Sequence, residues 1–322
     1  MKRFKNILFV AGPEEGAAAL HRAAALAREN QALLAVTSVV EALPGGTLVP
    51  DSSLTGEALQ SALVAEAQQR LDRLVAPWRD GLEIQTQVLA GTLFLEVVRD
   101  VLRNGRDLVV KPIADPGPWA WLLTGEDMHL LRKCPCPVWL QKRDAPARYR
   151  CILAAVDPGD EDSAGAAAQS ALNAQILELA ISLALAEFAE LHLVHVWNAI
   201  GEGVMRGTFL STPEEQVRAY VSAEGARHAM ALNSLIEEVT RRLGRETLAY
   251  VNPVKHLIKG AARDEIPALA RQLGADLAVL GTVARGGIPG LLMGNTAETL
   301  LHRLDCSLLA VKPSGFVSPI AP

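Results

Sequence analysis

The chain has 322 residues, of which 50% are hydrophobic and 21% are charged. This length and hydrophobic content are enough for two cores of ordinary size, each in a unit of about 150 residues. The formal net charge of −5 leaves no excess of basic residues, which argues against binding to nucleic acid or to an anionic membrane surface.

The amino terminus leads into an apolar run that begins at Asn6 and stops before Gly12. A membrane-spanning helix needs about 20 apolar residues, so this run is too short to be one, and it is also too short for a signal peptide. We therefore expect a soluble, cytoplasmic protein without a membrane span.

The first half of the chain alternates short apolar runs with Ala/Leu-rich or polar stretches, which predicts strands alternating with helices. A loop rich in Gly, Pro, Ser and Thr occupies 43–56. In chain order we predict strand Asn6–Ala11, helix Ala17–Arg28, strand Leu33–Val39, helix Glu57–Leu74, strand Ile84–Leu89, helix Thr92–Asn104, strand Leu108–Lys111 and, after a loop and a helix, strand Val138–Leu140.

The second half follows the same order, with a comparable loop at 201–213. Loops of this length often serve a site. Here we predict strand Cys151–Val156, helix Ala171–Phe188, strand Leu191–Trp197, helix Glu214–Leu243, strand Val254–Ile258, helix Ala261–Leu273, strand Leu277–Leu280, helix Ala297–Arg303 and strand Leu308–Val311.

Three residues at the ends of these elements recur after a fixed offset of 169 residues, which identifies an internal repeat of one structural unit. The recurring pairs are Gly91 and Gly260, Asp107 and Asp276, and Gly125 and Gly294. The polar stretch 141–150 separates the two copies, so we expect domains at 1–145 and 146–322.

Strands that alternate with helices predict a parallel, doubly wound α/β sheet with right-handed crossovers in each copy. Ligands of such sheets bind outside the carboxyl ends of the strands, at the point where the strand order reverses. In the second copy this point lies after the first and fourth strands. We therefore expect Asp157 and Gly281 to face one crevice.

The loop that follows the fourth strand of the second copy is rich in glycine and runs into a helix after Gly294. Backbone N–H groups of such a loop, together with the positive end of the helix dipole, favour an anion. Asn295 and Thr296 add polar side chains at the positions where helix caps belong.

This arrangement resembles the nucleotide-binding members of the universal stress protein family. Their pattern is Gly, two residues, Gly, nine residues, Gly and then Ser or Thr, with an Asp at the end of the first strand. Gly281, Ala284 and Gly294 stand at the three glycine positions here. The segments Asp127–Pro137 and Gly294–Glu298 resemble the tandem, two-domain branch.

The resemblance covers nearly all of the chain and implies two adenine nucleotide alpha hydrolase-like domains in tandem. Each would have a five-stranded parallel sheet flanked by helices, and the two would pair through their last strands as an internal pseudo-dimer. It also implies a site for ATP or AMP, with or without magnesium, in the second copy.

The resemblance assigns a role to each group of that site. Asp157 would accept hydrogen bonds from the ribose hydroxyls. The residues that would bracket the adenine are Val156, Val196 and Leu280. The residues whose backbone would hold the phosphates are Gly281, Ala284, Gly294, Asn295 and Thr296.

Two departures from the family pattern concern this site, because Ala284 replaces a glycine and Asn295 replaces a hydroxyl residue. At a position that needs a positive φ, alanine costs about 1 to 2 kcal/mol, or about tenfold in affinity. We expect a weakened nucleotide site rather than a lost one.

The first copy departs further from the pattern. The residues at the positions of Asp157, Gly281, Ala284, Gly294 and Asn295 are there Gly12, Pro112, Asp115, Gly125 and Glu126. Proline lacks a backbone donor, and the carboxylates of Asp115, Glu126 and Asp127 would repel phosphate. We expect no triphosphate in this copy.

The apolar segment Trp119–Leu123 of the first copy has two interpretations. We favour packing against the other half, because apolar clusters are more often core than ligand site. The alternative is an exposed patch for a protein partner or an apolar ligand. That alternative would make the chain a scaffold without nucleotide, in place of a nucleotide-responsive stress or regulatory protein.

The remaining reactive side chains favour structural roles. Cys134 and Cys136 lack a second cysteine pair, so packing is preferred over a redox or metal pair. His192 and His195 are three residues apart on a strand and point to opposite faces, so they cannot hold one metal together. No motif nominates a catalytic nucleophile or base. We expect no dedicated enzyme, with slow ATP hydrolysis left open.

Overall fold

The computed structural model describes residues 4–12, 16–44, 55–113, 125–159, 165–207, 212–282 and 295–322, with only the backbone described at 295 and 296. No described helix combines the length and the apolarity needed to cross a membrane.

The elements of the first half follow the predicted order, and short local signals fix several helix ends. Thr55 caps α2, because its hydroxyl accepts a hydrogen bond of 3.2 Å from the backbone N–H of Ala58. Gly105 ends α3 in the left-handed conformation, which glycine adopts without strain. The elements are β1 (Asn6–Ala11), α1 (Ala17–Asn30), β2 (Leu33–Val40), α2 (Gly56–Val75), the 3₁₀ turn η1 (Ala76–Trp78), β3 (Ile84–Ala90), α3 (Leu93–Asn104), β4 (Leu108–Pro112), α4 (Gly125–Lys133) and β5 (Val138–Gln141).

The second half repeats this order with two additional short helices, α6 and α8, and with two helices, α5 and α7, that are longer than their counterparts α1 and α2. The helix that precedes β7 begins at Ala166 rather than at the predicted Ala171, and a short helix lies within the predicted loop 201–213. The elements are β6 (Cys151–Ala155), α5 (Ala166–Glu187), β7 (Glu190–Trp197), α6 (Glu202–Arg206), α7 (Glu214–Leu243), α8 (Arg245–Val251), β8 (Val254–Lys259), α9 (Ala262–Leu273), β9 (Leu277–Gly281), α10 (Asn295–Leu301) and β10 (Ser307–Val311).

The ten strands of the described residues form one sheet in the order β3-β2-β1-β4-β5-β10-β9-β6-β7-β8. Within each half every neighbouring pair is parallel. The halves meet where β5 and β10 pair antiparallel, with Leu308 opposite Leu140. This confirms two doubly wound α/β units that are joined through their last strands.

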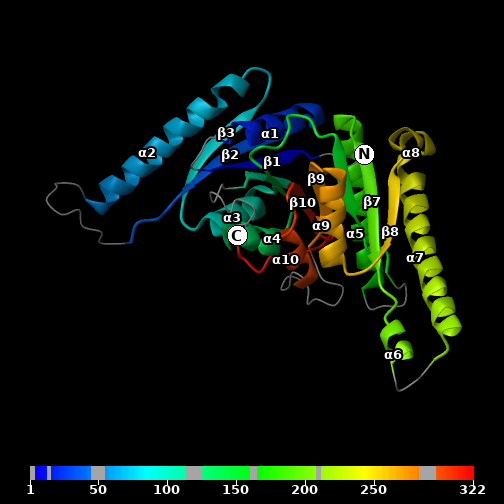
Figure 1. Cartoon of the computed structure of the whole chain (residues 1–322). Helices are drawn as coiled ribbons and strands as arrows, with labels where there is room; N and C mark the ends of the chain where they lie inside the picture. The colour runs from blue at the N-terminus through cyan, green and yellow to red at the C-terminus, as the bar shows by residue number, and fades with distance from the viewer. Residues whose placement is uncertain are drawn as a thin grey trace.

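Helices cover both faces of the sheet and form a three-layer structure (Figure 1). Side chains of α1, α5 and α7 share one buried apolar cluster on one face of the strands. Side chains of α3, α4, α9 and α10 share a second cluster on the other face. Helices α2 and α7 lie at opposite ends of the sheet.

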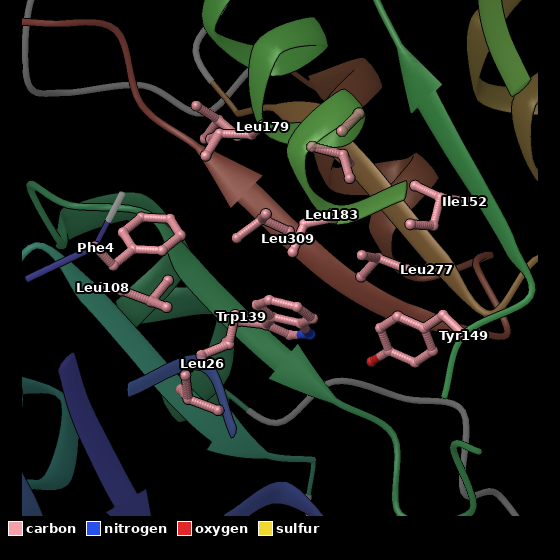
Figure 2. Close-up of a cluster of buried hydrophobic side chains, with 14 of the residues drawn as sticks. Phe4, Leu26, Leu108, Trp139, Tyr149, Ile152, Leu179, Leu183, Leu277 and Leu309 are labelled. Atoms are coloured by element: carbon pink, nitrogen blue, oxygen red, sulfur yellow. The ribbon is translucent and has the colours of Figure 1, made fainter. Parts of the chain in front are cut away.

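The buried cluster of the first face runs across the joint between the halves (Figure 2). Trp139 of β5 stacks on Tyr149, with ring centroids 6.0 Å apart. Arg22 of α1 places its guanidinium carbon 3.6 Å from the Tyr149 centroid, donates to the carbonyl of Pro146 at 3.0 Å, and pairs with Glu187 of α5. A buried cation with aromatic, carbonyl and carboxylate partners therefore ties the connecting segment to both halves.

Candidate functional site

A cavity of about 670 Å³ lies at the carboxyl ends of β6, β7 and β9 in the second half. The residues expected from the sequence that border it are Val156, Asp157, Val196, Leu280 and Gly281. Gly281 lies close to α5, because a Cβ there would lie 2.8 Å from Leu172 Cδ2 and the leucine side chain would have to shift. Asp157 and Gly281 thus face one crevice, as the strand order predicts.

The other four expected residues belong to the glycine-rich loop and the helix after it. Ala284 and Gly294 lie outside the described residues. Asn295 and Thr296 form the first turn of α10, and their side chains are not described. Ala297 and Leu300 of the same helix border the cavity, so the helix begins beside it.

The backbone of Asp157 is held by Asn173, a buried residue of α5. The Asp157 N–H donates to Asn173 Oδ1 at 3.0 Å, and Asn173 Nδ2 donates back to the Asp157 carbonyl at 2.8 Å. Gln169 Nε2 donates to the same Asn173 oxygen at 3.3 Å. These bonds fix the backbone at the end of β6 while the Asp157 side chain keeps 46% of its surface exposed. We did not predict Asn173, although an amide in so apolar a helix is a sequence signal.

One wall of the cavity is made by rings from β7 and α7. His195 Nε2 lies 2.9 Å from Nδ1 of His228, and its Nδ1 lies 3.3 Å from the Val156 carbonyl oxygen and 3.8 Å from Asp157 Oδ1. His228 also stacks on Trp197, with centroids 5.4 Å apart. The wall therefore offers aromatic faces and places a buried imidazole next to the Asp157 carboxylate.

Charged groups line the mouth of the cavity. Arg227 of α7 pairs with Glu224 at 2.8 Å and is 45% exposed. Arg263 near the start of α9 is 62% exposed. Both guanidinium groups border the cavity, and guanidinium groups pair well with phosphate oxygens. The mouth can therefore receive an anionic group, although salt screens such exposed charges.

His192 lies on the opposite face of β7, as the spacing predicts. Its Nδ1 lies 2.9 Å from Nε2 of His256 on β8. Burial, with a smaller contribution from His192, lowers the pKa of His256. Within the described ranges, no three His, Cys, Asp or Glu side chains are grouped so that they could hold a metal ion.

In the first half, bulky side chains lie where the second half has small ones. A Cβ on Gly16 would lie 3.1 Å from Pro112 Cγ and 3.4 Å from Phe9 Cζ, so these two side chains fill the space beside the start of α1. Alignment of the strands makes Ala154 the counterpart of Phe9 and Gly281 the counterpart of Pro112. Alignment of α1 with α5 on the left-handed residues that end them, Gln31 and Phe188, makes Asn173 the counterpart of Gly16. The larger side chains of this region therefore come from the strands in the first half and from the helix in the second half.

Two acidic residues of the first half are engaged by their own chain. Asp127 of α4 accepts a 2.8 Å bond from Lys111, and the two side chains are 0% and 7% exposed. Glu126 accepts a 2.8 Å bond from the backbone N–H of Phe94 at the start of α3. A carboxylate therefore already occupies this helix N-terminus. Asp115 and the segment Trp119–Leu123 lie outside the described residues.

A model of the universal stress protein family matches the chain twice, at residues 3–142 and 148–312. The chain belongs to the universal stress protein family. Universal stress protein E of Escherichia coli strain K12 is 31% identical over 229 residues, which are 70% of this chain and 67% of the relative. A universal stress protein E homolog of Haemophilus influenzae is 29% identical over 97% of this chain and 98% of its own length.

Solved structures of universal stress proteins and of a related protein share the whole two-domain arrangement. A protein of unknown function from Pseudomonas aeruginosa PAO1 is 27% identical, with a TM-score of 0.67 and coverage of 97% of this chain and 94% of that chain. A putative universal stress protein from Pseudomonas aeruginosa UCBPP-PA14 is 26% identical, with a TM-score of 0.65 and coverage of 97% and 95%. The tandem fold is therefore common to both.

Proposed function

We propose that this universal stress protein binds an adenine nucleotide, ATP or AMP, in the cavity of its second half and acts as a nucleotide-responsive regulatory protein. One observation carries the proposal. A single cavity is bordered by Gly281 and by the four expected site residues whose side chains the structure describes, Val156, Asp157, Val196 and Leu280. These residues come from three separate strands, so their convergence is not a consequence of sequence proximity.

The chemistry of the cavity suits the parts of a nucleotide. Val156, Val196 and Leu280 offer apolar surface to a base. The half-exposed carboxylate of Asp157 is positioned by Asn173 to accept hydrogen bonds from vicinal ribose hydroxyls. The first turn of α10 and the guanidinium groups at the mouth supply positive potential for phosphates.

The first half has a structural role in this proposal. Phe9 and Pro112 place large side chains beside the start of α1, at positions where the second half has the smaller Ala154 and Gly281. Glu126 also places a carboxylate on the α3 N-terminus, where a phosphate would meet like charge. We therefore expect one nucleotide for each chain.

We propose a binding role without a dedicated catalytic step. Slow ATP hydrolysis would then be insensitive to removal of any single imidazole at the cavity. Phosphate release from ATP by the parent and by His228→Gln tests this, and a rate that collapses in the variant would argue for a catalytic histidine.

The experiment that tests the site combines two ligands with two proteins. Parent and Asp157→Ala are titrated with ATP and with 2′,3′-dideoxy-ATP in the presence of magnesium. Hydrogen bonds to a charged acceptor contribute about 1.5 to 3 kcal/mol, so the parent should prefer ATP by roughly 10- to 100-fold. Asp157→Ala should bind the two nucleotides equally, because it lacks the acceptor that distinguishes them.

Asp144→Ala is the matched control, because Asp144 is an exposed carboxylate of the connecting segment that does not border the cavity. It should keep the parent's preference for ATP. The assignment fails if Asp157→Ala still discriminates between the nucleotides, or if the parent binds both equally.

A further inference from the structure

Cys134 and Cys136 form a buried thiol pair between the end of α4 and the start of β5. Their sulfurs lie 3.6 Å apart, and the backbone bends at Pro135 and Cys136. Cys134 has no exposed surface and Cys136 keeps 8%. Residues two apart share a face of an extended strand but lie roughly 7 Å from each other there, so the bend is what allows a contact this short.

A lysine of the other half lies beside this pair. Lys312 directly follows β10, the strand that pairs with β5. Lys312 is 4% exposed, and its ammonium donates to the carbonyls of Leu131 and Arg132 in the last turn of α4, at 2.5 and 3.5 Å. The thiol pair and the cation thus come from different halves and meet at their joint.

The surroundings shift the pKa values of the two thiols in opposite directions. Burial alone would raise the pKa of Cys134, but the thiol and the backbone N–H of Cys136 donate to its sulfur and Lys312 adds an opposite charge, so the net pKa is lowered. The pKa of Cys136 is raised well above its usual value by the same hydrogen bond and by burial. Burial also raises the pKa of Cys151 to about 11 and that of Cys306 to about 12.

We propose that Cys134 and Cys136 are a peroxide-sensitive dithiol that closes into an intramolecular disulfide at the joint between the two halves. The Cys134 thiolate attacks one oxygen of hydrogen peroxide, the O–O bond breaks, and the departing hydroxide takes a proton to leave as water. The Cys136 sulfur then attacks the resulting sulfenic acid, the S–O bond breaks, and the Cys136 proton leaves with the hydroxyl as a second water. Two thiols are oxidised and one peroxide is reduced.

Closure brings the two sulfurs from 3.6 Å to the disulfide bond length of about 2.05 Å. The reaction removes the negative charge that faces Lys312, so oxidation changes an electrostatic contact between the halves. Oxidation of this pair would therefore be sensed at the β5–β10 joint.

The test uses the native, full-length protein and hydrogen peroxide. After exposure the protein is alkylated, digested with trypsin and analysed by mass spectrometry. Cleavage after Lys133 and Lys142 yields a peptide, Cys134–Lys142, that holds both thiols and no other cysteine. We expect this peptide to become two hydrogen atoms lighter and to resist alkylation. Cys151 and Cys306 fall in separate peptides and serve as internal controls that remain alkylated.

Two variants separate the charge effect from a general effect of substitution. Lys312→Met should slow disulfide formation roughly threefold to tenfold, because the fraction of thiolate falls. Lys255→Met removes an exposed lysine on β8 and should leave the rate unchanged. The proposal is overturned if both thiols of the Cys134–Lys142 peptide stay fully alkylated, if Cys151 and Cys306 oxidise as fast, or if oxidation occurs only after unfolding in urea. An unchanged rate in Lys312→Met would overturn the role of the ammonium.

Discussion

Replacement of Asn173 by alanine tests the positioning of the candidate site without any ligand. Asn173 makes two bonds to the backbone of Asp157, at 3.0 and 2.8 Å. Each hydrogen bond contributes about 1 kcal/mol net, so the variant should lose about 2 kcal/mol of unfolding free energy. The assay is equilibrium urea unfolding, with the midpoint and the slope compared between parent and variant.

Ser170→Ala is the control for this substitution. Ser170 is exposed and lies one helical turn before Asn173 in α5, so both variants gain the same helix propensity from alanine. The reasoning is refuted if Asn173→Ala unfolds within about 0.5 kcal/mol of Ser170→Ala, which is the usual range of surface substitutions. Asn173→Ala should also weaken ATP binding roughly tenfold, because Asp157 would no longer be pre-positioned.

Three further predictions concern the loop, the first half and the joint. Ala284→Gly should tighten ATP binding about tenfold in calorimetry, since it restores the glycine of the family pattern. Lys111→Met should lower the unfolding free energy by about 3 to 5 kcal/mol because it leaves the buried Asp127 carboxylate without this cation, and adding Asp127→Leu should restore most of that loss. Burial lowers the pKa of Lys312 from 10.5 to about 8, so between these pH values the unfolded chain binds the proton that the folded chain has lost. Stability of the parent relative to Lys312→Met should therefore rise by about 3 kcal/mol from pH 8 to 10.5 in urea unfolding, and a flat difference would contradict this.

The sequence was sufficient to predict the alternation of strands and helices, because the apolar runs of the central strands are buried, while the edge strands β3 and β8 remain partly exposed. The pairing of β5 with β10 was expected only through the family resemblance, since an antiparallel joint leaves no local pattern. The short helix α6 was missed for a physical reason. It has five residues and contains Gly203, and the ion pairs of Glu202 with Lys259 and of Arg206 with Glu214 link it to other elements.

The site residues at the ends of strands were predictable from the sequence, but the site residues on the face of a helix were not. Asp157 and Gly281 terminate neighbouring parallel strands, so topology alone brings them together. His228 and Tyr220 reach the cavity from α7, a 30-residue helix with few buried positions. Nothing local in that sequence says which face of the helix turns toward the cavity, because tertiary packing decides its rotation.

Calorimetric titration of ligand-free protein with ATP and magnesium tests most directly whether the second half alone carries a nucleotide site. The account predicts saturation near one nucleotide per chain, and ATP affinity roughly 10- to 100-fold weaker in Asp157→Ala. Saturation near two nucleotides per chain would contradict it, since the first half would then bind as well. Absence of binding heat and of any thermal shift with millimolar ATP would also contradict it.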